Sequence, residues 1–140
     1  MVAAPAPGGR PCPCGRLDGR GRPLVFAACC GRYIGHADCP APDAESLMRS
    51  RYSAYVLGDA AYLQATWHAR TRPPTMDANA AGARWLGLQV HDARGTGEQT
   101  AEVEFTARWR DASGRGQRMR ERSRFVQEQG RWYYVDGDVA

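Results

Sequence analysis

Two pairs of cysteines near the start of the chain constrain its fold more than any other feature. Cys12-Pro13-Cys14-Gly15 places two thiols one residue apart, and Cys29-Cys30-Gly31 supplies an adjacent second pair. The stretch around them, residues 12 to 40, is rich in glycine and lacks hydrophobic periodicity, so it buries too little apolar surface to order itself. A bound metal is the natural means of ordering such a segment. The alternative is a loosely ordered loop with incidental thiols.

The chemistry of the thiols predicts zinc. Thiolates suit Zn²⁺ better than Ca²⁺ or Mg²⁺, and two close pairs bring four ligands to one point with little loss of backbone entropy. Four thiolates fill a tetrahedral sphere and leave no position for a catalytic water, which predicts a structural site. The expected ligands are Cys12, Cys14, Cys29 and Cys30. A fifth thiol, Cys39, is expected to be a spectator; the alternative is that Cys39 or His36 replaces one ligand.

Composition and the N-terminal residues bound the cellular setting. The 140 residues and 43% hydrophobic content suit one domain, and all 19 basic residues behind the net charge of +4 are arginine. Abundant Arg, Ala, Gly and Pro are typical of a GC-rich genome, so a nucleic-acid partner is allowed but not favoured. No signal peptide or membrane-spanning run is predicted. We therefore expect a cytoplasmic protein, where reduced cysteines more often bind metal than form disulfides.

Residues 1–11 are expected to form a flexible tail, residues 12–40 the metal-binding segment, and residues 41–140 an α+β domain. Asp43 is a suitable N-cap for a helix that ends at Leu57, before Gly58. One face of this helix carries residues at helical spacing: Leu47, Met48, Arg51, Tyr52, Tyr55 and Val56.

A second, shorter helix is predicted after Asp59, carrying Trp67 and closed by Arg72-Pro73-Pro74. The remainder changes to the period-two pattern of strands with one buried face. The predicted strands are Ala83 to Ala93, Thr100 to Arg110, Gln117 to Glu128 and Arg131 to Asp136. Hairpin turns are expected at 94–97, 111–116 and 129–130, which gives a four-stranded antiparallel meander with two helices packed on it.

The cysteine motifs carry a family resemblance. Cys-Pro-Cys-Gly followed by Cys-Cys-Gly resembles the SEC-C motif, a small zinc hook, although the fourteen residues between Cys14 and Cys29 make a longer loop than the motif usually has. The run LMRSRYSAY at 47–55, Gly58-Asp59, and the final run around 130–137 resemble the bacterial YchJ-like family. This resemblance implies a SEC-C hook followed by a nuclear-transport-factor-like, cystatin-like cone, in which a curved antiparallel sheet wraps around helices. The family's biochemical role is not established.

A cone of this kind leaves a cavity between sheet and helix whose polar residues can form a site. The candidates are Arg49, Tyr52, Tyr55, Trp67, His68, Glu121, Ser123, Tyr134 and Asp136. The competing interpretation is that the aromatic residues are core, His68 caps the second helix, and Asp136-Gly137 makes a terminal turn.

A second polar feature is an arginine ladder, in which Arg118, Arg120, Arg122 and Arg124 share one sheet face opposite Glu102 and Glu104. Such a ladder is typical of a solvated face; the alternative is a surface that grips RNA or an acidic protein.

Two functions remain. The first, which leans away from an enzyme without excluding one, is a zinc-binding adaptor whose hook and cone surface engage a protein or ribonucleoprotein partner. A homodimer through the open sheet face is a further expectation. The alternative is an enzyme or small-ligand-binding protein that uses the cone cavity with His68, Glu121 and Asp136. Nucleophile-elbow, Walker and dinucleotide motifs are absent from the sequence, which weakens the common enzyme classes.

Overall fold

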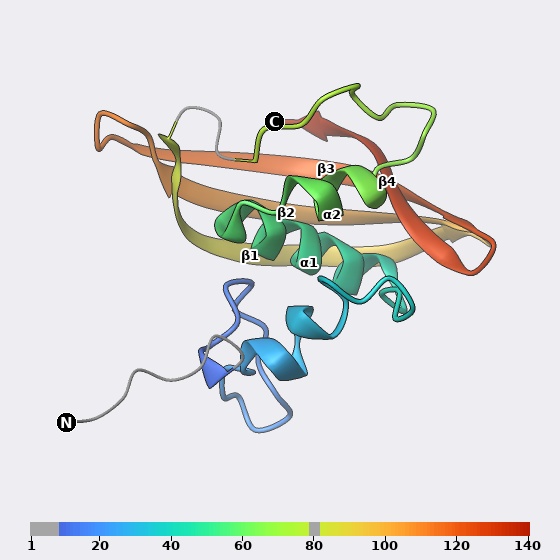
Figure 1. Cartoon of the computed structure of the whole chain (residues 1–140), viewed down its shortest axis with the longest axis horizontal. Helices are drawn as coiled ribbons and strands as arrows, with labels where there is room; N and C mark the ends of the chain where they lie inside the picture. Colours follow the sequence, from blue (N-terminus) through green and yellow to red (C-terminus); the bar gives the residue numbers. More distant parts are fainter. Residues whose placement is uncertain (1–8, 79–81) are drawn as a thin grey trace.

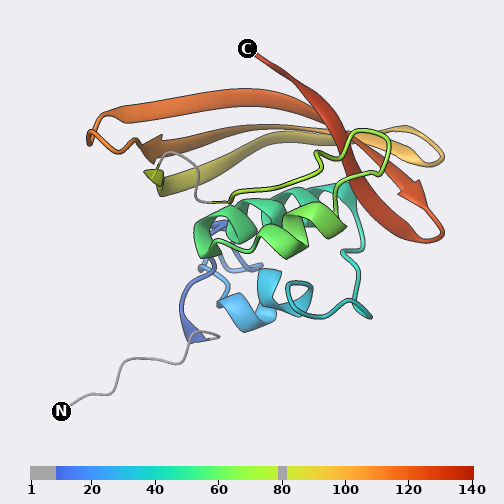
Figure 2. The ribbon, with the colours of Figure 1, turned by 45° about the horizontal axis from the view of Figure 1, so that its top comes forward.

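The computed structural model describes residues 9–78 and 82–140, arranged in three layers. A four-stranded sheet forms the first layer, and helices α1 (Ala44–Leu57) and α2 (Ala60–Ala65) cover one of its faces (Figure 1). The cysteine-rich hook, with two short 3₁₀ turns, η2 (Phe26–Ala28) and η3 (Cys30–Arg32), lies on the other side of the helices (Figure 2). Across the two described stretches, no helix has both the length and the apolar character needed to cross a membrane.

Helix α1 begins and ends where the sequence predicts. The Asp43 side chain accepts a hydrogen bond from the Ser46 backbone N–H at 2.7 Å, and Gly58 closes the helix in the left-handed conformation. Most of α1 is buried because the sheet covers one side and the hook the other. Even Ser50 and Ser53 have no exposed surface, so both faces of this helix are interior.

Helix α2 is shorter than predicted. It begins at the expected cap, Asp59, but ends at Ala65 instead of continuing to the prolines. The chain leaves the helix here because it joins the edge of the sheet. The Tyr134 N–H donates to the Thr66 carbonyl at 2.9 Å, and the His68 N–H donates to the Tyr134 carbonyl at 2.7 Å.

Four antiparallel strands follow in the spatial order β1-β2-β3-β4, which confirms the predicted meander. They are β1 (Arg84–Gly97), β2 (Thr100–Arg110), β3 (Gly116–Glu128) and β4 (Arg131–Val139). Strand β1 continues through the turn predicted at 94–97, because its glycines mark a register shift between Gly95 and Gly97 instead of a reversal. Strand β4 likewise continues past Asp136 and pairs with β3 to its end. Register shifts in both outer pairings bend the sheet around α1.

One continuous core joins the hook to the sheet. The four cysteines of the two pairs belong to the same buried cluster as Leu47 and Tyr52 of α1, Val103 of β2 and Phe125 of β3. Helix α1 is therefore the shared wall between the hook on one side and the inner face of the sheet on the other.

Candidate functional site

The two cysteine pairs converge on one buried point. The four Sγ atoms of Cys12, Cys14, Cys29 and Cys30 lie within 4.8 Å of one another, and none of the four residues is more than 5% exposed. A tetrahedral zinc ion with Zn–S bonds of about 2.3 Å holds its sulfur ligands about 3.8 Å apart. The observed Cys14 Sγ to Cys29 Sγ distance of 3.6 Å fits that requirement. The cluster therefore has the ligands and spacing for a metal ion.

Local backbone structure explains this convergence. The Gly15 N–H donates to the Cys12 carbonyl at 3.1 Å and closes the first turn, while the second pair sits at the junction of η2 and η3. A Cβ atom at Gly31 would lie 2.7 Å from the Phe26 carbonyl oxygen, so the glycine after the second pair allows the chain to fold back closely. The sequence motif Cys-Cys-Gly thus encodes the geometry as well as the ligands.

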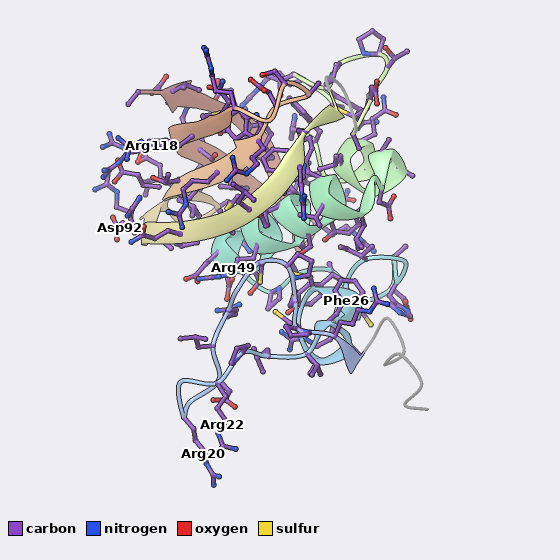
Figure 3. The ribbon with its side chains drawn as sticks, turned by 90° about the vertical axis from the view of Figure 1, so that its left-hand side faces the viewer. Arg20, Arg22, Phe26, Arg49, Asp92 and Arg118 are labelled. Carbon is purple, nitrogen blue, oxygen red and sulfur yellow. The ribbon has the colours of Figure 1, made fainter. Side chains whose placement is uncertain are left out.

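The long loop between the pairs forms an extension of its own. Isolated antiparallel bridges join Pro11 to Val25 and Leu17 to Pro23, so the extra residues project as a narrow hairpin. Arg20 and Arg22 lie at its tip, far from the sulfur atoms (Figure 3). The insertion therefore leaves the four-cysteine cluster intact.

Electrostatics of the thiols also favours a bound cation. Burial, followed by the nearby thiols of Cys14 and Cys12, raises the pKa of Cys29 to about 12. Hydrogen bonds with Cys12 and Cys14 raise the pKa of Cys30, whereas hydrogen bonds from Cys14 and Cys30 lower that of Cys12. Without a cation, four such close thiols do not all ionise. A divalent ion neutralises the thiolates it binds.

Arg49, predicted to line the cone cavity, lies at the boundary between hook and helix (Figure 3). Its Nη1 donates to the Cys14 carbonyl at 3.1 Å and its Nε donates to Glu45 Oε2 at 2.8 Å. On the same side of α1, Ser53 Oγ is 3.5 Å from Cys12 Sγ. This placement corrects the prediction for Arg49, which contacts the backbone of the four-cysteine cluster instead of facing the sheet.

The cone cavity lies between α1 and the inner face of the sheet and has a volume of about 320 Å³. Its lining is predominantly aromatic and comprises Met48, Arg51, Tyr52, Tyr55, Trp67, Trp85, Phe105, Ala107, Trp109, Met119, Glu121, Ser123, Phe125 and Tyr134. Six of the nine residues predicted for this site line it, namely Tyr52, Tyr55, Trp67, Glu121, Ser123 and Tyr134.

Sequence reasoning missed the most unusual residue of the cavity. Arg51 is only 5% exposed, and its Nη1 donates to the Leu63 carbonyl and to Thr66 Oγ1, each at 2.7 Å. The guanidinium carbon lies 5.0 Å from the centre of the Trp67 ring and 4.7 Å from that of Tyr134. The sequence did contain a signal for Arg51, because it shares one helical stripe with the cavity residues Met48 and Tyr55.

A carboxylate lines the same cavity. Glu121 Oε2 accepts hydrogen bonds from the Ser123 hydroxyl and, at 3.2 Å, from the Tyr134 hydroxyl. Burial, with the charge of Glu121, raises the pKa of Tyr134 and keeps its hydroxyl protonated as a donor. A Cβ atom at Gly137 would lie 2.5 Å from Glu121 Oε2, so this position of β4 leaves the space that the carboxylate occupies.

Comparison with known proteins decides the family. The profile described as "YchJ, middle NTF2-like domain" matches residues 43–137. The chain belongs to the YchJ family.

Relatives of this family member include a UPF0225 protein of Polaromonas sp. (strain JS666), 58% identical over 99% of both chains, and one of Polaromonas naphthalenivorans, 57% identical over 91% of this chain and 96% of the relative. Two solved structures are similar, both described as SEC-C motif containing proteins. The structure from Rhodopseudomonas palustris is 32% identical with a TM-score of 0.76. The match covers 91% of this chain and 97% of the Rhodopseudomonas chain. The structure from Psychrobacter arcticus is 29% identical with a TM-score of 0.78. The match covers 96% of this chain and 85% of the Psychrobacter chain. The resemblance inferred from the sequence and the cone fold are therefore confirmed.

Two predicted cavity residues lie elsewhere in this YchJ family member. His68 Nε2 bonds to Glu128 Oε1 at 2.5 Å, and Asp136 accepts from Arg124 Nε at 2.6 Å. Neither lines the cavity, because α2 ends before His68 and a register shift between Arg124 and Phe125 places Asp136 on the outer face. The predicted trio of His68, Glu121 and Asp136 is not assembled.

The arginine ladder on the outer sheet face has the predicted register, with Glu102 opposite Arg124 and Glu104 opposite Arg122. Its charges are largely paired: Glu104 contacts Arg120 and Arg122, while Arg124 binds two aspartates of β4. The geometry favours a solvated ion-pair face.

Proposed function

We propose that this YchJ family member binds a small molecule in its cone cavity, on a frame held together by a structural zinc ion. One observation carries the ligand-binding part: the buried guanidinium of Arg51 borders a cavity of about 320 Å³ and uses only Nη1 for hydrogen bonds among the described residues. A buried charge without full pairing is costly, so its presence beside a cavity favours a binding or catalytic role. Cavities of this size with aromatic walls and few polar groups are typical of small-molecule sites.

The zinc assignment rests on the donor set. Four buried sulfur ligands at tetrahedral spacing suit Zn²⁺, and they leave no open coordination position, so the ion supplies folding energy and no catalytic step. The cytoplasm is the location that fits this proposal, because clustered cysteines in a reducing compartment more often bind metal than form disulfides.

The tryptophans provide a direct test of the cavity. Trp67, Trp85 and Trp109 line the cavity, whereas Trp132 lies outside it. In ¹⁵N-labelled protein titrated separately with phenol, indole and benzoate, we expect at least one probe to shift the three cavity indole N–H resonances and leave that of Trp132 unchanged. Single Trp→Phe variants assign the four signals.

A pair of alanine variants gives the control. Ala107 lines the cavity and is 2% exposed, whereas Ala112 is exposed in the β2–β3 hairpin. Ala107→Leu narrows the cavity and is expected to weaken the shifts at least tenfold, while Ala112→Leu leaves them unchanged. If none of the probes moves the cavity signals, or Trp132 alone responds, ligand binding in the cavity is wrong.

An adaptor is the second candidate function, favoured by one surface feature. A groove of about 560 Å³ is lined from the hook by Tyr33 and His36, from α2 by Ala61, and from β4 by Trp132. The groove therefore joins hook and cone in one surface, as an adaptor that uses both would need. Its natural occupant under this proposal is a protein or ribonucleoprotein partner, or a second copy of the chain.

The adaptor role predicts a groove-dependent complex. A charge introduced by Ala61→Glu lies in the groove and is expected to abolish a complex isolated from the native cell. Ala112→Glu, which is also exposed but lies outside the groove, is expected to retain the complex. Affinity purification with both variants and the wild type, followed by identification of the bound species, measures the effect. Equal recovery of the partner with both variants would exclude the groove.

A further inference from the structure

The geometry points to the class of ligand that the cavity takes: we infer that it is a small planar aromatic acid whose carboxylate is held by Arg51. This inference rests on the proposed ligand-binding function of the cavity. It follows from three properties of the described lining residues: an open hydrogen-bonding edge on a buried cation, flat aromatic walls, and an acceptor group elsewhere in the same cavity.

The open edge belongs to the Arg51 guanidinium. Both of its hydrogen bonds start at Nη1 and end on neutral oxygens, of Leu63 and Thr66. Arg51 belongs to none of the ion pairs in the described parts of the chain. Nε and Nη2 donate no hydrogen bond to any described residue. These two nitrogens form the side of the guanidinium that binds a carboxylate through two parallel hydrogen bonds. Arg51 thus presents an unused bidentate fork.

The cost of this arrangement indicates that an anion completes it. Arg51 is only 5% exposed, and its burial lowers the pKa of the guanidinium, because the buried charge loses its hydration. The rings of Trp67 and Tyr134 offset part of that loss through their negative faces. The negative charge of Glu121, which lines the same cavity, offsets a further part, but Glu121 makes no direct ion pair with Arg51 among the described residues. A ligand carboxylate would supply that direct partner.

The walls select a flat ligand. Trp85 lies 5.6 Å from Tyr52, 5.7 Å from Tyr55 and 5.5 Å from Trp109, measured between ring centres, so aromatic faces and edges dominate the cavity surface. The Trp85 indole N–H is buried without a hydrogen-bond partner among the described residues. Such a donor is costly to leave unpaired, which marks Trp85 as a polar contact that this aromatic wall could offer to a ligand acceptor.

Glu121 defines a second polar contact. Its carboxylate would repel a ligand acid group placed beside it, so the acid belongs at Arg51. Both hydrogen bonds that Glu121 accepts end on Oε2, from Ser123 and Tyr134, which leaves Oε1 as an acceptor. A hydroxyl or amino group on the ligand ring matches that acceptor. The inferred class is therefore an aromatic acid that also carries a hydrogen-bond donor.

The decisive experiment compares ligands of equal shape and different charge on the unchanged protein. Benzoate and benzamide are titrated into ¹⁵N-labelled wild type, and the dissociation constants are taken from the indole N–H shifts of Trp67, Trp85 and Trp109. We expect benzoate to bind at least tenfold tighter than benzamide, and 4-hydroxybenzoate or 3-hydroxybenzoate to bind tighter than benzoate. Equal affinity of benzoate and benzamide overturns the inference while the cavity remains a ligand site. Silence of every probe overturns the proposed function itself.

Two variants separate binding from stability. Arg51→Gln removes the fork and is expected to abolish the preference for benzoate over benzamide. Thr66→Val removes one acceptor of Nη1 and leaves Nε and Nη2 untouched, so it is expected to lower the melting temperature and keep the preference. Loss of the preference in both variants would show that Arg51 acts only through the fold and would overturn the inference. If Arg51→Gln does not fold, the comparison of benzoate with benzamide on the wild-type protein still tests the inference.

Discussion

Protein purified without added metal is expected to contain one zinc ion per chain, and Cys29→Ser is expected to abolish it. Cys29 is 2% exposed inside the four-sulfur cluster, and a serine hydroxyl is a poor replacement for a thiolate ligand. Apparent binding free energies of structural zinc sites are on the order of 10 kcal/mol, so this is the largest effect that any single substitution in the chain should have. Elemental analysis measures the metal content.

The fifth cysteine provides the matched control. Cys39 is exposed and lies outside the cluster, so Cys39→Ser is expected to keep the full zinc content. Hydrogen exchange reports the structural consequence: the Cys12 and Leu24 amides, which bond to the carbonyls of Leu24 and Arg16, should lose protection in Cys29→Ser and keep it in Cys39→Ser. Metal-free wild-type protein with these amides still protected would contradict a structural zinc ion.

The hook was predictable because its information is local. Ligand type, close pairing and a following glycine are all written in consecutive residues, and the structure places the four sulfur atoms together. Strand β2 was equally predictable, since Val103, Phe105 and Ala107 alternate with polar residues and the observed bounds match the pattern from Thr100 to Arg110. One side of this strand faces the core along its whole length, so the alternation of apolar and polar residues is enough to locate the strand.

The cavity was only partly predictable because it depends on non-local geometry. Tyr134 and Asp136 share a parity in the sequence, so regular pairing would place both on one face, but the register shift opposite Arg124 and Phe125 puts them on opposite faces. The prediction that Arg49 lines the cavity was wrong for a different reason. A lone helix with one buried stripe cannot show that its second face is also covered, and the hook covers it here.

Arg51 illustrates a limit of residue-type reasoning. An arginine on the apolar stripe of a helix is usually expected to extend to the surface, with its charge in water. The guanidinium stays inside because the shortened α2 offers the Leu63 carbonyl and the Thr66 hydroxyl at its end. That contact depends on where α2 stops, which is set by pairing with β4 and not by the helix sequence.

Leu47→Ala is expected to destabilise the whole protein by about 2–5 kcal/mol, as large-to-small substitutions at fully buried leucines do. Leu47 is 2% exposed and belongs to the cluster that contains both the cysteines and the inner face of the sheet. Because α1 is the wall shared by hook and cone, we expect the loss to affect both together. Chemical denaturation followed by near-ultraviolet circular dichroism gives the free energy of unfolding.

A second leucine of α1 supplies the control. Leu57 is 54% exposed at the end of the same helix, so Leu57→Ala is expected to change the free energy of unfolding by less than about 0.5 kcal/mol. Zinc release, followed with a chromophoric chelator during the same denaturation, tests the coupling. Coincident midpoints for zinc release and loss of the aromatic signal are expected if hook and cone share one core, because a shared core unfolds as a unit. Release of zinc well before the sheet unfolds would mean that α1 separates two independent units, and Leu47→Ala would then shift only one of the two transitions.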